Sequence, residues 1–369
     1  MIINPQFNHL KKWIKTYLGP ATAQFHELKT LKHLAIRVEN RNAIIPSLTT
    51  EINGKLFYFS VKGCGAYEDM FYGGELLPSK IKSACRDPSL FPKIDNLKTG
   101  LGFIMGETWM GEAPYGAYGE ENAFDELNIS KLAKFDSIND AHICPIIGIT
   151  KLPKKIEDTA RNFFWFRKHP ERFFQVLRLV PSNVRLYFES EELMTDPKHI
   201  FSLFGISSTK DIEEFELNFI KSGIALLTLF SRTIKRDKDE ISGLVYQDVW
   251  FDKDCVIAPD GTIHFADLEG LVWKSIPFKD YEKTAKTEWQ RLIFEFLWVL
   301  MRIDTFRLEK EGRDLDWSKQ RNELALLIHL ALSNDIYAHP EQHDDNLNII
   351  IELPSFPQVK IPLLEKVKS

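Results

Sequence analysis

The stretch Leu244–Leu271 reads LVYQDVWFDKDCVIAPDGTIHFADLEGL and decides how the second half of the chain is interpreted. Two short apolar runs flank the turn sequence at residues 259–261, Pro-Asp-Gly, so the stretch predicts a β-hairpin. Asp254 precedes the first run and Asp267 follows the second, and folding back brings the two acids together. Converging carboxylates repel unless a cation lies between them, and such oxygen ligands suit Mg²⁺ or Mn²⁺. The stretch therefore predicts a metal site, unless both acids simply lie at solvated strand ends.

Composition indicates an ordinary globular protein with room for two lobes. The chain has 369 residues, of which 44% are hydrophobic and 12% aromatic, enough to bury a substantial core. The formal net charge of −5 argues against a general nucleic-acid-binding protein, although a local basic groove stays possible.

The cysteines and the apolar runs bear on the compartment. Four cysteines lie far apart and form no CxxC or zinc-type spacing, which favours free thiols in a reducing compartment and hence the cytoplasm. The longest later apolar run, Phe296–Met301, is far shorter than the roughly 18 residues that span a bilayer. We expect no signal peptide and no contact with a membrane.

The first half has the signals of an antiparallel sheet. Residues 1–30 read as a helical lead-in, and the turn signal Asn53-Gly54 feeds the alternating segment Lys55–Lys62, KLFYFSVK. A glycine-rich insertion or lid follows over residues 63–119. The segment Glu120–Phe135 predicts a helix that carries Glu126, because acids at its start favour the helix dipole.

The later segments divide the chain near residue 190. Ile143–Ile149 predicts a strand, and Phe174–Val180 with Val184–Glu189 predicts a hairpin that closes the sheet. Ile212–Lys235 and Tyr281–Lys310 have the apolar spacing of helices. We therefore expect an α+β protein with a sheet-rich N-terminal lobe at residues 1–190 and a mainly helical C-terminal lobe at residues 191–369.

The order of these features resembles that of the protein-kinase-like superfamily. A strand lysine, a helix glutamate, a long helix, an aspartate, a second metal ligand and Asp-x-x-Gly follow one another in that fold. The matching residues are Lys62, Glu126, Asp248 in YQD, Asp254, and Asp267 in DLEG. The resemblance implies a bilobal kinase-like fold in which Lys62 and Glu126 align ATP, and in which Asp254 and Asp267 hold Mg²⁺.

Within that superfamily, FSVKGCG at Phe59–Gly65 looks most like the strand and K-G-x-G step of the selenoprotein O-like AMP-transferases. The catalytic segment also resembles the aminoglycoside phosphotransferases. This chain departs from the pattern, since no His precedes Asp248 and Asp254 replaces the usual asparagine. Gly100 and Gly102 are candidates for a substitute glycine cap over the phosphates.

The expected function is an ATP- and Mg²⁺-dependent transferase that moves a phosphoryl or an adenylyl group to a hydroxyl-bearing acceptor, either a protein or a small molecule. Asp248 would accept the proton of the attacking hydroxyl, unless the AMP-transferase resemblance holds and gives it no such task. One alternative is a nucleotide-binding or empty pseudokinase scaffold that recognises another protein. Another is an unrelated α+β protein with an accidental hairpin.

Several of these candidate residues also have an ordinary structural explanation. Lys62 could be a gatekeeper at a sheet edge, and Glu126 could be a solvated helix acid. His264 alternates with Ile263 and Phe265 and reads as a hydrogen-bonded strand histidine, while His339 and His343 read as loop residues around a proline. The sequence therefore assigns no zinc.

Overall fold

In the computed structural model the chain divides into two units. The first contains Met1–Phe135 and Cys144–Asn183, and the second contains Asp136–Ile143 and Val184–Ser369. The structure describes residues 1–12, 42–62, 71–72, 75–76, 118–151, 172–182, 184, 197–233, 235–237, 240–246, 249, 251–277, 291–292, 295–296, 298–300, 302–313, 337–343, 346–352 and 359–364.

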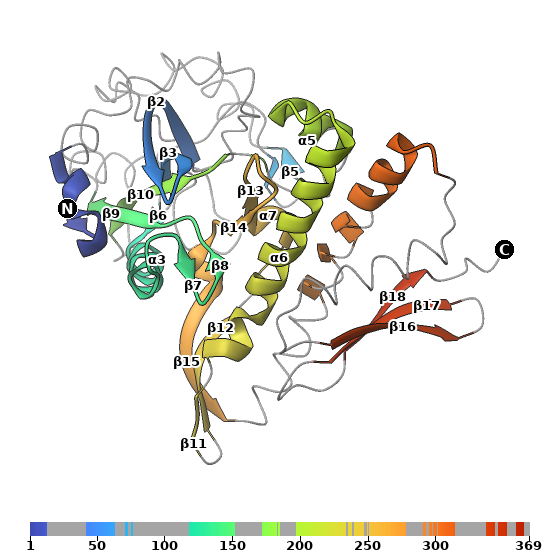
Figure 1. The fold of residues 1–369 in the computed structure, drawn as a ribbon. Coiled ribbons are helices and arrows are strands. Elements are labelled where there is room, and N and C mark those ends of the chain that lie inside the picture. Colours follow the sequence, from blue (N-terminus) through green and yellow to red (C-terminus); the bar gives the residue numbers. More distant parts are fainter. Residues whose placement is uncertain are drawn as a thin grey trace. The chain divides into compact units, whose positions relative to one another are not determined.

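The first unit is built on a six-stranded sheet in which each described pair is antiparallel (Figure 1). Its strands are β1 (Ile2–Ile3), β2 (Asn42–Ile52), β3 (Lys55–Lys62), β6 (Tyr118–Gly119), β9 (Ile146–Lys151) and β10 (Phe173–Val180). The spatial order is β1-β9-β10-β3-β2, and β6 pairs with β10. A separate two-stranded ribbon is formed by β4 (Phe71–Tyr72) and β5 (Glu75–Leu76). The expected antiparallel sheet in the first half is therefore confirmed.

The turn between β2 and β3 has the geometry that its sequence predicts. Asn53 and Gly54 have φ angles of 51° and 76°, in the left-handed region that Asn and Gly tolerate best. The turn aligns Ile52 with Lys55 and sends β3 back along β2. Along β3, Phe57, Phe59 and Val61 are buried, each at 2% exposure or less. Burial of each phenylalanine contributes on the order of 1.5–3 kcal/mol to the stability of the sheet.

Helix α3 (Glu120–Leu132) packs on this sheet against β9 and β10. Glu120 and Glu121 lie in its first turn, where the helix dipole favours negative charge. The expected helix over this segment is confirmed, and it ends slightly before the expected boundary at Phe135.

The N-terminus differs from the expected helical lead-in. Ile2 and Ile3 form a strand that pairs with β9, and a short 3₁₀ helix, η1 (Pro5–Leu10), follows. Asn4 caps this helix by accepting a hydrogen bond from the backbone N–H of Gln6 at 3.3 Å, with Pro5 at the first helical position. The cap and the proline stop the strand and start a tight turn, which the apolar pattern alone does not indicate.

Two other strand expectations are met in part. The strand expected over Ile143–Ile149 starts later, at Ile146, and continues to Lys151. The strand expected at Phe174–Val180 is present as β10, which pairs with β3, β6 and β9. Apart from Val184, the expected hairpin partner lies outside the described residues.

The second unit contains α5 (Pro197–Phe204), α6 (Thr209–Thr233) and α7 (Phe251–Asp254). Phe215 and Phe219 are buried along α6, and the ring of Phe219 stacks on that of Phe296 with centroids 5.5 Å apart. Gly223 lets the ring of Phe296 lie close to α6, because a Cβ at position 223 would lie 2.2 Å from a Phe296 ring atom. The helix expected over Ile212–Lys235 is present as α6, and the described residues of the helix expected over Tyr281–Lys310 are helical, at 291–292, 295–296, 298–300 and 302–310.

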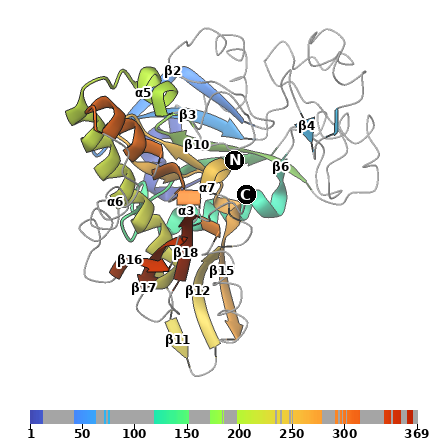
Figure 2. The same cartoon turned by 90° about the vertical axis from the view of Figure 1, so that its right-hand side faces the viewer.

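Among its described residues, the second unit also holds antiparallel sheets beside these helices. β11 (Lys235–Asp237), β12 (Glu240–Tyr246) and β15 (Leu271–Pro277) form one antiparallel sheet, visible as a ribbon in Figure 2. A further antiparallel sheet contains β16 (Tyr337–His343), β17 (Asn346–Glu352) and β18 (Val359–Leu364).

His339 and His343 therefore lie in a strand, whereas the sequence interpretation placed them in a loop. Pro340 suggested the loop because proline cannot donate a backbone hydrogen bond to a ladder. The structure places β16 at the edge of its sheet, where a strand tolerates proline.

A buried ionic network links α6 to the helix at residues 302–310. Arg307 donates a hydrogen bond from Nε to Glu216 Oε2 at 2.8 Å and another from a terminal nitrogen to Asp304 Oδ1. Burial and the charge of Asp304 together raise the pKa of Glu216 to about 8, against the opposing effect of Arg307. One guanidinium thus binds two acidic side chains.

Within the part of the chain that the structure describes, no helix has the length and the apolar character needed to cross a membrane.

Candidate functional site

The first set of candidate residues centres on a buried ion pair in the first unit. Lys62 Nζ lies 2.7 Å from Glu126 Oε1, and the two side chains are 2% and 0% exposed. Tyr118 completes a triangle: its hydroxyl donates to Glu126 Oε1 at 2.7 Å and accepts from Lys62 Nζ at 3.1 Å. The lysine ammonium also lies 4.2 Å from the centre of the Tyr118 ring.

Three separate elements bring this triangle together. Lys62 ends β3, where it is aligned with Asn42 of β2 and Val176 of β10. Glu126 lies on α3, and Tyr118 lies on β6 one residue before the N-cap of that helix. Lys62 thus lies in an interior strand of the sheet, and Glu126 is buried. Lys62 is therefore not a gatekeeper at a sheet edge, and Glu126 is not a solvated helix acid.

Burial of these charges is costly unless they are paired. Removing a carboxylate and an ammonium from water costs several kcal/mol per ion, which their mutual attraction and further hydrogen bonds offset. The tyrosine supplies such hydrogen bonds to both ions and places its ring face near the cation. The result is a lysine whose position is fixed by its surroundings.

The second set lies in the hairpin of the second unit, and its predicted geometry is confirmed. β13 (Cys255–Ile257) and β14 (Ile263–Phe265) pair antiparallel, with Cys255 aligned with Phe265. The backbone carbonyl of Asp254 accepts hydrogen bonds from the N–H groups of Ala266 at 2.7 Å and Asp267 at 3.2 Å. The acids at the two ends of the hairpin are therefore neighbours.

Asp254 and Asp267 differ in environment. Asp254 is the last residue of α7 and is 6% exposed, whereas Asp267 is partly exposed and precedes a short 3₁₀ helix, η5 (Leu268–Gly270). A metal held here would thus meet one buried and one accessible carboxylate.

Helix α6 holds the turn of this hairpin. Asn218 donates a side-chain hydrogen bond to the backbone carbonyl of Asp260 at 2.9 Å, and the hydroxyl of Ser222 accepts one from the N–H of Ile263 at 2.9 Å. Gly261 has a φ of 89°, and a Cβ at this position would lie 2.2 Å from the backbone oxygen of Phe215. Glycine is therefore required both by the backbone conformation and by the close approach to α6.

Three of the sequence candidates cannot be placed. Asp248, Gly100 and Gly102 lie outside the described residues. The structure thus describes Lys62, Glu126, Asp254 and Asp267, and it joins them in two pairs, one in each unit.

Tyr118 is a member of the first set that sequence reasoning missed. Its hydroxyl binds both members of an ion pair whose residues lie 56 and 8 positions away in the chain. The only available signal was its place directly before Gly119 and the acid-rich start of α3, which marks a helix N-terminus but not a hydrogen-bond partner.

No family model matches this chain, and no curated protein or solved structure matches it. What the structure establishes is a mixed α and β protein with an antiparallel sheet in its first unit. The kinase-like resemblance rests on the residues and their order.

Proposed function

We propose that this protein is an ATP- and Mg²⁺-dependent transferase of the protein-kinase-like superfamily, which moves a phosphoryl or an adenylyl group to a hydroxyl-bearing acceptor. The observation that carries the proposal is the buried ion pair between Lys62 and Glu126. A structural role alone does not call for a charged pair here, since a buried ion pair often stabilises a fold no better than apolar side chains.

A fixed lysine suits phosphate binding. In the proposal Lys62 offers its ammonium to phosphate oxygens, and Glu126 with Tyr118 keeps it in place, so that little side-chain entropy is lost on binding. Glu126 and Tyr118 are then positioning residues, because they would act through Lys62.

The donor atoms of the second set fit Mg²⁺. Asp254 and Asp267 offer carboxylate oxygens, the ligands that Mg²⁺ prefers, and the hairpin fixes their backbones next to each other. Bound Mg²⁺ would supply charge neutralisation at the phosphate oxygens. In the proposal Asp248 accepts a proton from the acceptor hydroxyl if the reaction is phosphoryl transfer.

The test is calorimetric titration with a non-hydrolysable ATP analogue, with and without Mg²⁺. We expect metal-dependent binding by the wild-type protein and its loss in Asp267→Ala. The matched control is Glu214→Ala, which removes an exposed acid of α6 and should leave binding unchanged. Lys62→Met should also weaken the analogue, since the proposal assigns the ammonium of Lys62 to the phosphate oxygens.

Two results would overturn the proposal. Unaltered Mg-ATP analogue binding in Asp267→Ala would remove the site assignment, and no binding by the wild type would favour an unrelated α+β protein. Binding without turnover on any acceptor would support the pseudokinase alternative in place of an enzyme.

A further inference from the structure

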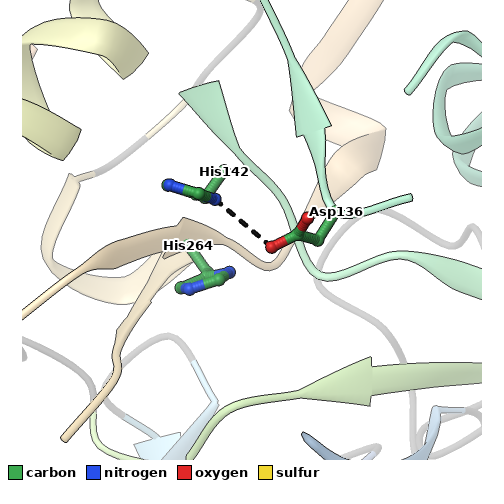
Figure 3. Close-up of side chains that lie close together, drawn as sticks. All are labelled: Asp136, His142 and His264. Carbon is green, nitrogen blue, oxygen red and sulfur yellow. Dashed lines mark hydrogen bonds and ion pairs between the residues drawn. The ribbon is translucent and has the colours of Figure 1, made fainter. Parts of the chain in front are cut away.

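Three metal-ligating side chains meet in the second unit, apart from the residues proposed to bind Mg²⁺ (Figure 3). Asp136, His142 and His264 each offer a ligand atom, and these atoms all lie within 4.8 Å of one another. His142 Nδ1 lies 3.3 Å from Asp136 Oδ2, and the two imidazole rings have centroids 4.9 Å apart.

A tight hairpin sets the position of the first two residues. β7 (Ser137–Ile138) and β8 (Ala141–His142) are joined by Asn139 and Asp140, whose φ angles are 46° and 69°. The N–H of Ile143 donates to the carbonyl of Asp136 at 2.7 Å. The backbone therefore brings Asp136 and His142 to the same end of the hairpin before any ligand binds.

The third residue comes from the hairpin that also carries Asp254 and Asp267. Ile143 forms an isolated parallel bridge with Phe265, which places the neighbouring His264 beside the β7–β8 hairpin. His264 Nδ1 lies 3.4 Å from the backbone oxygen of Ile143. Two hairpins more than a hundred residues apart in the chain thus supply the three side chains.

Burial and the set of donor atoms both suit a cation. Asp136 and His264 are buried, whereas the side chain of His142 is 27% exposed and gives access from solvent. One carboxylate oxygen and two imidazole nitrogens, all within 4.8 Å of one another, form a donor set that a divalent cation can bind.

An ion pair between Asp136 and His142 accounts for only part of this arrangement. That pair needs one imidazole, whereas the ring of His264 lies 4.9 Å from that of His142 and offers a further nitrogen to the same place. A divalent cation binds a carboxylate and two imidazoles together, which accounts for all three side chains.

We propose that Asp136, His142 and His264 form a binding site for a divalent transition metal of the Zn²⁺ class. Two nitrogens and one oxygen match the ligand preference of such ions, whereas Mg²⁺ prefers oxygen alone. Ligands of tetrahedral Zn²⁺ lie about 3.3 Å apart, given bonds of about 2.0–2.1 Å. Asp136 and His142 already have that separation, so small side-chain rotations complete the site.

The experiment uses the full-length protein, stripped with a chelator and titrated with Zn²⁺ by calorimetry and with Co²⁺ by visible absorption. We expect one high-affinity equivalent and the d–d bands of low-coordinate Co²⁺. His142→Ala should weaken Zn²⁺ by more than the roughly 10- to 100-fold that loss of an outer-shell contact causes. The control His9→Ala removes an exposed histidine of the first unit and should change neither signal.

Further variants separate this site from the proposed nucleotide site and from a folding defect. Asp267→Ala should retain Zn²⁺ binding, and Asp136→Asn should lose it while its circular dichroism spectrum stays native. The proposal is overturned if His142→Ala and Asp136→Asn bind Zn²⁺ as the wild type does, or if stripped wild-type protein binds no Zn²⁺.

Discussion

Removal of the charge on Glu126 tests the buried ion pair most directly. Glu126→Gln keeps the size of the side chain but removes the carboxylate charge that faces Lys62, whose side chain is only 2% exposed. At the observed 2.7 Å separation, the gross Coulomb attraction is about 6 kcal/mol with an effective dielectric constant of about 20. Part of this attraction offsets desolvation, and loss of one partner of such a pair costs about 3–5 kcal/mol.

The full design is a double-mutant cycle. Lys62→Met should cost a similar amount on its own, because it leaves the carboxylate buried without its lysine. The double variant with Glu126→Gln should lie within about 2 kcal/mol of the wild type, since both members of the buried pair are then neutral and the amide oxygen can still accept from Tyr118.

The assay is urea denaturation followed by tryptophan fluorescence, from which the free energy of unfolding is obtained by linear extrapolation. Glu121→Gln makes the same chemical change at an exposed position of α3 and should stay within about 0.5 kcal/mol of the wild type. The reasoning would be refuted if the losses in free energy of unfolding of the two single variants simply added in the double variant. It would also be refuted if Glu126→Gln cost as little as Glu121→Gln.

Two further predictions concern the second unit. The pKa of Glu216, raised to about 8 from 4.5 by burial and by Asp304, means that its proton is bound more tightly in the folded state. The stabilisation of the folded state by this proton is complete below pH 4.5. It is lost as the pH rises through 8, at up to about 1.4 kcal/mol per pH unit. Glu216→Gln should therefore flatten the stability curve between pH 5 and 8 in urea titrations, and an unchanged slope would contradict the assignment. Gly261→Ala should lower stability by at least about 2 kcal/mol, through its positive φ and the clash with Phe215. In thermal unfolding it should lower Tm more than Gly312→Ala, where φ is also positive but no atom lies within 4 Å of the added Cβ; equal shifts would exclude the clash.

Features with a local signal could be predicted from the sequence. The Asn53-Gly54 turn and the hairpin at residues 255–265 depend on residues that contact their near neighbours in the chain, so short-range turn chemistry sufficed. Lys62 and Glu126 lie far apart in the chain, although their side chains are in contact. Their pairing was expected only because the order of motifs resembles a known fold.

Features that depend on distant partners could not be predicted. Nothing in the residues around Tyr118 indicates that its hydroxyl reaches Lys62. His264 read as an ordinary strand histidine because its neighbours Asp136 and His142 come from another hairpin, which the bridge between Ile143 and Phe265 brings alongside. The β16–β18 sheet was missed because the effect of Pro340 depends on whether its strand lies at an edge.

The assignment of Asp136–Ile143 to the second unit has a consequence for dissecting the protein. These eight residues are flanked on both sides by chain of the first unit, so no single cut yields two complete pieces. A fragment that starts at Val184 would lack the hairpin that lies beside Phe265 and would leave that edge of β14 uncovered. During synthesis the segment emerges long before the strand it joins, so the second unit completes its fold only when the ribosome has passed β14. A synthetic peptide spanning Asp136–Ile143, added to the isolated C-terminal fragment, is therefore the natural complement to test.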